Sequence, residues 1–99
     1  MIDFSQLDKT IHERGRLSIM TLLAARSEWS FQDLKSELQM SDGNLITHLR
    51  TLQDAGFITL DKQATDSRPL TTCRLTPAGR RAFTRYLSLL EQIIKATGR

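Results

Sequence analysis

The apolar residues of the first quarter of the chain recur at spacings of three and four, the period of an amphipathic helix. The pattern predicts helix from Phe4 to Ser27. Gly15 lies inside this stretch, and because glycine weakens a helix interior by about 1 kcal/mol relative to alanine, we expect it to divide the segment into a short helix and a longer one. The next residues, 28–30, are too few for more than an extended connection.

The middle of the chain predicts two helices with a very short link between them. Residues 31–38 carry apolar side chains at the spacing of a two-turn helix, and 39–41 separate them from the next apolar series. Ser41 is a candidate N-cap for a helix over about 42–55, because its hydroxyl can accept a hydrogen bond from a free N–H of the first turn. The leucines on one side of that helix are Leu45, Leu49 and Leu52.

The remainder predicts a hairpin and a last helix. Residues 57–60 and 70–75 are rich in strand formers, and the polar, turn-forming stretch between them makes the pair an antiparallel hairpin. Thr76 followed by Pro77 is a helix start, an N-cap with proline at the first helical position. We expect this helix to run over about 77–96.

This order of elements defines the expected fold. Helix, short link, helix and hairpin is the order of a winged helix-turn-helix, whose second helix enters the DNA major groove and whose hairpin, the wing, touches the neighbouring backbone. A chain of 99 residues holds one such domain and not two. We therefore predict an α+β fold, mostly α, in which residues 1–99 form a single winged-helix DNA-binding domain. Its parts are a recognition helix over about 42–55, a two-stranded wing over about 57–75 and a C-terminal helix over about 77–96.

Composition narrows the function classes. No stretch approaches the ~20 apolar residues that span a bilayer, and the N-terminus lacks the basic and apolar regions of a secretory signal, so we expect a cytoplasmic protein without membrane contact. The single cysteine excludes an internal disulfide, and no Cys or His cluster has zinc-site spacing, so neither a metal nor another cofactor is expected. No nucleophile and base, paired carboxylates or phosphate loop has catalytic spacing, which argues against an enzyme.

The charge distribution suggests a nucleic-acid partner. The net charge is +3, and ten of the 14 basic residues are arginine, the type suited to bidentate contacts with phosphate and guanine. The basic excess lies in residues 43–85, which contain the predicted recognition helix and wing. On charge alone, a solvated basic face explains the pattern equally well.

The predicted recognition helix adds chemistry to this charge. Its leucines project to one side, and small or polar residues project to the other. Asparagine can bond bidentately to adenine, arginine to guanine, and threonine offers a hydroxyl or a methyl group to a base edge. Gly43 would let the backbone approach a phosphate at the helix N-terminus. The candidate DNA-binding residues on this face are Gly43, Asn44, Thr47, Arg50 and Thr51.

Three basic residues near this face each have two possible roles. His48 lies at the border of the two helix faces, and both a histidine bonded within the domain and a phosphate contact remain open for it. Lys62 and Arg68 make the hairpin basic, and Arg68 near the expected tip is best placed to touch the DNA backbone or minor groove. Exposed hairpin ends are also often basic without any partner.

Several short motifs make the chain similar to a known family. They are Ile11-His12, Arg16-Leu17-Ser18-Ile19-Met20, Ser41-Asp42-Gly43-Asn44-Leu45, Ala55-Gly56-Phe57-Ile58 and Leu75-Thr76-Pro77-Ala78-Gly79-Arg80. In order and spacing, from about Leu7 to Leu87, they resemble the short bacterial and archaeal winged-helix regulators related to the MarR and ArsR families. The resemblance implies a dimeric DNA-binding transcription factor with recognition positions at Ser41, Gly43, Asn44, Thr47, His48 and Thr51. The chain departs from the family in its wing, where only Arg68 stands near the tip, and at Cys73, where an aromatic residue is common.

The last helix carries more apolar surface than one small domain needs. Phe83, Leu87, Leu90 and Ile94 form one stripe, and Tyr86, Leu89 and Ile93 form a second beside it. Two stripes suggest two partners, the domain's own core and a second subunit. We predict a homodimer in which the last and first helices pair across a two-fold axis, through Phe4, Leu7, Ile11, Tyr86, Leu89 and Ile93. The other interpretation is a wide helix folded wholly onto its own domain.

These observations predict a homodimeric transcriptional regulator, expected to be a repressor, that binds a pseudo-palindromic double-stranded DNA operator sequence-specifically. The alternative is a docking or dimerisation module, since fold does not fix function; the polar outer face of residues 42–51 favours DNA. A small-molecule effector could bind between the dimerising helices and the core, but no residue identifies it. Cys73, beside Arg74, is either an oxidant-sensing thiol or a small core hydrophobe.

Overall fold

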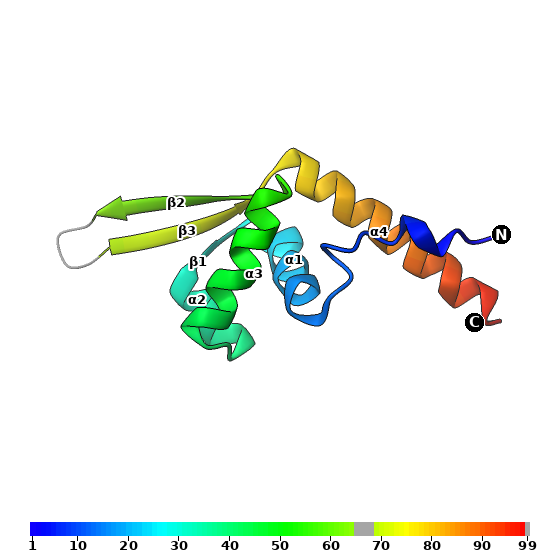
Figure 1. Cartoon of the computed structure of the whole chain (residues 1–99), viewed down its shortest axis with the longest axis horizontal. Helices are drawn as coiled ribbons and strands as arrows, with labels where there is room; N and C mark the ends of the chain where they lie inside the picture. The colour runs from blue at the N-terminus through cyan, green and yellow to red at the C-terminus, as the bar shows by residue number, and fades with distance from the viewer. Residues whose placement is uncertain (65–68, 99) are drawn as a thin grey trace.

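The computed structural model describes residues 1–64 and 69–98 and has the expected α+β architecture, mostly helical (Figure 1). The first half contains a 3₁₀ helix, η1 (Phe4–Gln6), then α1 (Arg14–Arg26), β1 (Glu28–Ser30), α2 (Phe31–Leu38) and α3 (Asp42–Asp54). The second half contains β2 (Ile58–Ala64), β3 (Pro69–Leu75) and α4 (Pro77–Ala96). No helix in the described part of the chain is both long and apolar enough to cross a membrane.

Helices α2 and α3 form the predicted helix-turn-helix, and local capping fixes where each begins. The Ser30 hydroxyl accepts a hydrogen bond from the Asp33 N–H at 3.1 Å, and the Ser41 hydroxyl accepts one from the Asn44 N–H at 3.2 Å. Gln39 ends α2 in the left-handed conformation, with φ of 54°, which redirects the chain after a single residue. Helix α3 therefore begins where the sequence predicts.

The wing belongs to a three-stranded antiparallel sheet in the order β1-β3-β2. The expected hairpin is present, with Ile58 paired to Leu75 at its base. Residues 28–30, expected to be a short extended connection, are extended and also pair as a strand, whose central residue, Trp29, lies opposite Cys73. Three residues carry too little pattern to predict a strand, and the pairing arises because β3 offers them its free edge.

The first helical segment divides at a different place from the one predicted. Helix α1 begins at Arg14 because the Glu13 carboxylate accepts a hydrogen bond from the Arg16 N–H at 2.7 Å, and the break precedes Gly15. Gly15 is buried in the first turn of α1, where an added Cβ would lie 2.6 Å from Nε2 of His48. This glycine allows α1 and α3 to pack closely and does not interrupt the helix.

One hydrophobic cluster joins the helices to the sheet. Its fully or almost fully buried members come from every layer: Ile11, Ile19, Met20, Leu23, Leu34, Leu45, Leu49, Leu52, Ile58, Cys73, Ala82, Phe83 and Tyr86. The three leucines predicted for the inner side of the recognition helix are among them. Cys73 is buried too, and burial raises the pKa of its thiol to about 11. It is a core hydrophobe, and the interpretation of a thiol activated by Arg74 is wrong.

The burial of Cys73 predicts a chemical behaviour. We expect the folded protein to resist thiol reagents at mildly alkaline pH, since the thiolate is the reactive form and the raised pKa keeps it scarce. A colorimetric disulfide reagent, followed with and without guanidinium, checks this. The unfolded chain should react at once and the folded chain only as fast as it opens; an immediate full reaction of the folded protein would contradict the assignment.

Helix α4 extends away from the rest of the molecule. The protein measures 55 × 25 × 21 Å, and Figure 1 shows the second half of α4 projecting from the body with the N-terminal segment beside it. The first half of α4 is anchored, with the Tyr86 hydroxyl 2.7 Å from Nδ1 of His12. Among the described residues of the projecting half, Leu87 and Ile94 are large apolar side chains that remain exposed.

Candidate nucleic-acid interface

Helix α3 presents its polar face to solvent. Gly43, Asn44, Thr47 and Arg50 are all exposed, whereas the leucines behind them are buried. Gly43 and Asn44 lie in the first turn of the helix, where free N–H groups attract anions, and Thr47 and Arg50 follow in the second and third turns. An amide, a hydroxyl and a guanidinium on one outward face are groups that can read base edges in the major groove.

The threonines on this face have their hydroxyl hydrogens engaged within the helix. Thr47 donates to the Gly43 carbonyl at 2.9 Å, and Thr51 donates to the Thr47 carbonyl at 3.1 Å. In this arrangement Thr47 offers a base its lone pairs and its methyl group, so it suits an amino group of adenine or cytosine, or a thymine methyl. Thr51 is half-buried and is less accessible to a base.

Asp42, at the start of α3, is an acidic residue that would repel phosphate, and Lys35 of α2 neutralises its charge. The Asp42 carboxylate lies 2.9 Å from Nζ of Lys35. The Ser41 hydroxyl accepts the N-cap hydrogen bond of α3. Its first role is therefore to end the turn and fix the start of the helix. Sequence reasoning missed the Lys35 partner because the two residues belong to different helices.

His48 faces α1. Of the two interpretations that the sequence left open, the structure agrees with a histidine bonded within the domain. Its Nδ1 lies 3.2 Å from a guanidinium nitrogen of Arg16 and 3.6 Å from the Glu13 carboxylate, while the far edge of its ring packs on Gly15. Its side chain is half-buried. His48 therefore fixes the position of α3 against α1 and does not lie on the outward face.

Glu13, which caps α1 beside His48, makes stability depend on acid pH. Hydrogen bonds from the Arg16 and Gly15 N–H groups, with smaller contributions from the charges of His48 and Arg16, hold the pKa of its carboxyl below the ordinary value. A depressed folded-state pKa stabilises the fold above the ordinary pKa of glutamate, and this stabilisation is lost as pH falls through the lowered value.

We therefore compare the natural protein with a Glu13→Gln variant as pH falls from above the ordinary pKa of glutamate to below the lowered pKa of Glu13. We expect the unfolding free energy of the natural protein to decrease more than that of the variant. Glu13→Ala, which removes the cap altogether, should cost about 1 kcal/mol at neutral pH. Urea unfolding at a series of pH values measures both effects. Parallel pH profiles for the natural protein and Glu13→Gln would contradict the first expectation.

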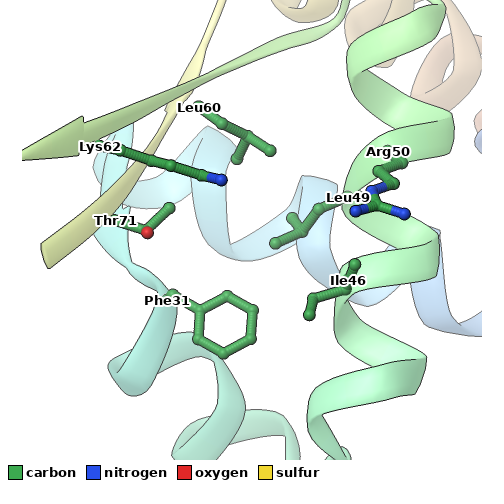
Figure 2. Close-up of a pocket in the computed structure, with 7 residues that line it drawn as sticks. All are labelled: Phe31, Ile46, Leu49, Arg50, Leu60, Lys62 and Thr71. Atoms are coloured by element: carbon green, nitrogen blue, oxygen red, sulfur yellow. The ribbon is translucent and has the colours of Figure 1, made fainter. Parts of the chain in front are cut away.

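A groove of about 240 Å³ separates α3 from the wing (Figure 2). Its floor is apolar, and its two walls each contribute a cation, Arg50 from α3 and Lys62 from β2. Lys62 thus lies across the groove from Arg50 of α3, whereas Arg68 lies outside the described residues. The groove is lined by Phe31, Ile46, Leu49, Arg50, Leu60, Lys62 and Thr71.

Ile46 is a residue of this groove that sequence reasoning missed. It is 39% exposed although it lies on the recognition helix between buried leucines. The available signal was its place next to Leu45, outside the apolar stripe, but an isolated exposed apolar residue is common and needs no special role. Phe31 is half-buried and also faces the groove.

Other arginines have partners within the fold. Nε of Arg74 lies 2.7 Å from the Glu28 carboxylate across β1 and β3. Arg80 donates to the Ser27 hydroxyl at 3.1 Å and so ties α4 to the end of α1. Both interactions place these guanidinium groups on the sheet and α4, away from the outward face of α3.

The residues predicted to form the subunit contact do not lie together on one surface. Ile11 and Tyr86 are buried in this chain's own core, so their assignment to a partner surface is wrong. Phe4 is 61% exposed, while Leu7, Leu89 and Ile93 are half-buried. The exposed apolar side chains of α4 are instead Leu87 (47%) and Ile94 (55%), from the other stripe. The sequence contains both stripes, but only packing shows which of them the core covers.

The described residues contain no group of three or more His, Cys, Asp or Glu side chains that could hold a metal ion. The interface consists instead of an outward polar helix face, a cation-lined groove and a two-stranded wing. These parts are suited to contacting a polyanion over an extended surface, and comparison with known proteins places the chain among proteins that do so.

A curated relative, an uncharacterized protein of Methanocaldococcus jannaschii, is 35% identical over 80 residues, which cover 81% of this chain and 87% of that protein. The structure of a transcriptional regulator homologue from Pyrococcus horikoshii superposes with a TM-score of 0.87 at 29% identity, covering 94% of this chain and 93% of that one. A MarR-family regulator of Porphyromonas gingivalis shares the fold, with a TM-score of 0.69 at 23% identity over 88% of this chain and 80% of its own.

A family model also matches most of the chain. It describes a winged helix DNA-binding domain and covers residues 16–94, from the first turn of α1 to the last turn of α4. The matched segment contains the helix-turn-helix, the wing and every core residue named above except Ile11. The chain therefore belongs to the family of winged helix DNA-binding domains, which are DNA-binding regulators and not enzymes.

Proposed function

We propose that the protein binds a pseudo-palindromic DNA operator sequence-specifically as a homodimer. The observation that carries the proposal is the outward face of α3, where Asn44, Thr47 and Arg50 are all exposed, one in each of the first three turns of the helix. Asn44 would pair with adenine and Arg50 with guanine, and Thr47 would accept a hydrogen bond or contact a methyl group. Lys62 would hold a phosphate beside them.

The exposed apolar side chains of α4 support the dimer. Leu87 and Ile94 lie two turns apart on the projecting helix, and Phe4 is exposed on the segment beside it. A second copy that covers these side chains would remove them from water and place two recognition helices on one duplex. Half-sites about 34 Å apart, one turn of DNA, are the usual consequence of such symmetry.

We further propose that the dimer represses transcription, because a protein bound over a promoter excludes polymerase by occupancy. A small-molecule effector that releases it remains a prediction from the sequence. A promoter–reporter assay with and without the protein tests repression directly, with increased reporter output in the absence of the protein as the expected result. Unchanged or lower output would contradict repression.

Fluorescence anisotropy tests sequence-specific binding. The natural upstream DNA and duplexes selected from a random library are compared with shuffled duplexes of equal composition, each at several salt concentrations. We expect a preference of ~10³ or more for a selected duplex, with salt-dependent affinity for both. Equal, weak binding to all duplexes would contradict specificity, and no binding at low salt would favour a protein-docking module.

Variants separate base reading from charge. Asn44→Ala and Arg50→Ala should each weaken binding to the selected duplex by about tenfold to a hundredfold and relax the preference at one base position. Arg81→Ala is the matched control, because Arg81 is an exposed arginine of α4 away from the outward face of α3. Equal losses in Arg50→Ala and Arg81→Ala would show that charge alone acts.

A further inference from the structure

The groove between α3 and the wing has charged and apolar surfaces side by side, as a DNA strand also has. Its cations, Arg50 and Lys62, come from opposite walls, and none of the residues that line it is acidic. Between them lies an apolar floor with Ile46 and Leu60 on its two sides (Figure 2). A sugar-phosphate strand has anionic phosphates next to apolar sugar carbons, so the groove is complementary to it in charge and in polarity.

Ile46 is the apolar side chain of this groove that also belongs to the recognition helix. Leu45, Leu49 and Leu52 fill the inner side of α3, so the core does not require another apolar residue at position 46. Ile46 precedes Arg50 by about one helical turn and shares its side of α3, whereas Asn44 projects to nearly the opposite side. A base that Arg50 reaches in the major groove therefore has neighbours close to Ile46.

In the major groove, the edges of the four bases present a single apolar group that an isoleucine side chain can contact. Thymine carries a 5-methyl group, whereas the other edges there present hydrogen-bonding atoms and the bare C5–H of cytosine. Isoleucine has no donor or acceptor, so placing it against a polar edge would desolvate that edge without compensation. Contact with a methyl group removes apolar surface of both partners from water.

We propose that Ile46 is a specificity-determining residue that contacts the 5-methyl group of a thymine, next to the base that Arg50 reads, while Lys62 holds the backbone of the strand lying in the groove. The inference rests on the proposed function and names a base that the polar residues do not determine. Each operator half-site then requires one thymine near the edge of the recognition-helix footprint. The two-fold symmetry of the dimer repeats the requirement in the other half-site.

The test removes the methyl group and nothing else. In a duplex selected from a random library, each thymine is replaced in turn by deoxyuridine, which keeps its base pairing. We expect one position per half-site at which the natural protein binds the uracil duplex about threefold to tenfold more weakly, the loss for about one buried methyl group. An Ile46→Ala variant should bind the two duplexes equally at that position.

Leu70→Ala is the matched control, because Leu70 is 38% exposed on β3, close to the exposure of Ile46, but does not line the groove. This variant should keep the full preference for thymine. Circular dichroism and thermal unfolding check that both variants fold. Selection of no duplex would mean failure of the proposed function. A selected duplex with no uracil-sensitive position, or with a preference that persists in Ile46→Ala, would overturn the role of Ile46 alone.

Discussion

A Gly79→Ala variant is expected to lose about 3 kcal/mol of unfolding free energy, at the upper end of what overpacking usually costs. Gly79 is buried in the first turn of α4, against the backbone at the start of β2. An added Cβ would overlap the Phe57 carbonyl oxygen and lie 2.9 Å from a methyl carbon of Leu75. The carbonyl cannot rotate away, because the Thr76 N–H donates to it at 3.0 Å.

Thermal unfolding at fixed protein concentration measures this loss. For a domain of this size, 3 kcal/mol lowers the melting temperature by more than about 10 °C. Gly43→Ala is the matched control, since Gly43 is also a helical glycine but has no neighbouring atom within 4 Å of an added Cβ. It should be stabilised by up to about 1 kcal/mol through helix propensity. Equal melting temperatures for Gly79→Ala and the natural protein would contradict the packing argument.

Separation of the subunits is the second large effect we expect. Leu87→Asp combined with Ile94→Asp would place carboxylates in the proposed contact, twice each by symmetry, and an unpaired buried charge costs several kcal/mol. Both side chains are about half exposed in a single copy, so the fold of each subunit should persist. The variant should be monomeric at micromolar concentration and bind its operator at least about a hundredfold more weakly, because joint binding of two half-sites is lost.

Sedimentation and anisotropy measure these two effects, and circular dichroism checks the fold. Ser88→Asp is the matched control, because Ser88 is exposed and follows Leu87 but projects about 100° further round the helix. It should remain dimeric. A dimer that survives both aspartates would exclude this surface as the contact, and a natural protein that is monomeric at micromolar concentration would remove the homodimer itself.

The recognition helix illustrates how far the sequence predicts the candidate site. The period of its leucines correctly separated the buried side from Gly43, Asn44, Thr47 and Arg50, because the helix period alone decides which residues share a face. The position of His48 at the border left two interpretations open, and its contacts with α1 determined which holds. The groove could not be predicted, because its walls come from segments far apart in the chain.

The sequence by itself determined the elements, since caps, proline and period act between residues a few positions apart. Ser41 and Thr76 each mark a helix start, and the structure has α3 and α4 beginning at the next residue. Only the tertiary structure decided what depends on distant partners. It paired residues 28–30 with β3, placed Gly15 against His48, and buried Tyr86 while leaving Leu87 exposed. Those outcomes depend on which surfaces meet when the helices pack, and residues far apart in the chain determine them.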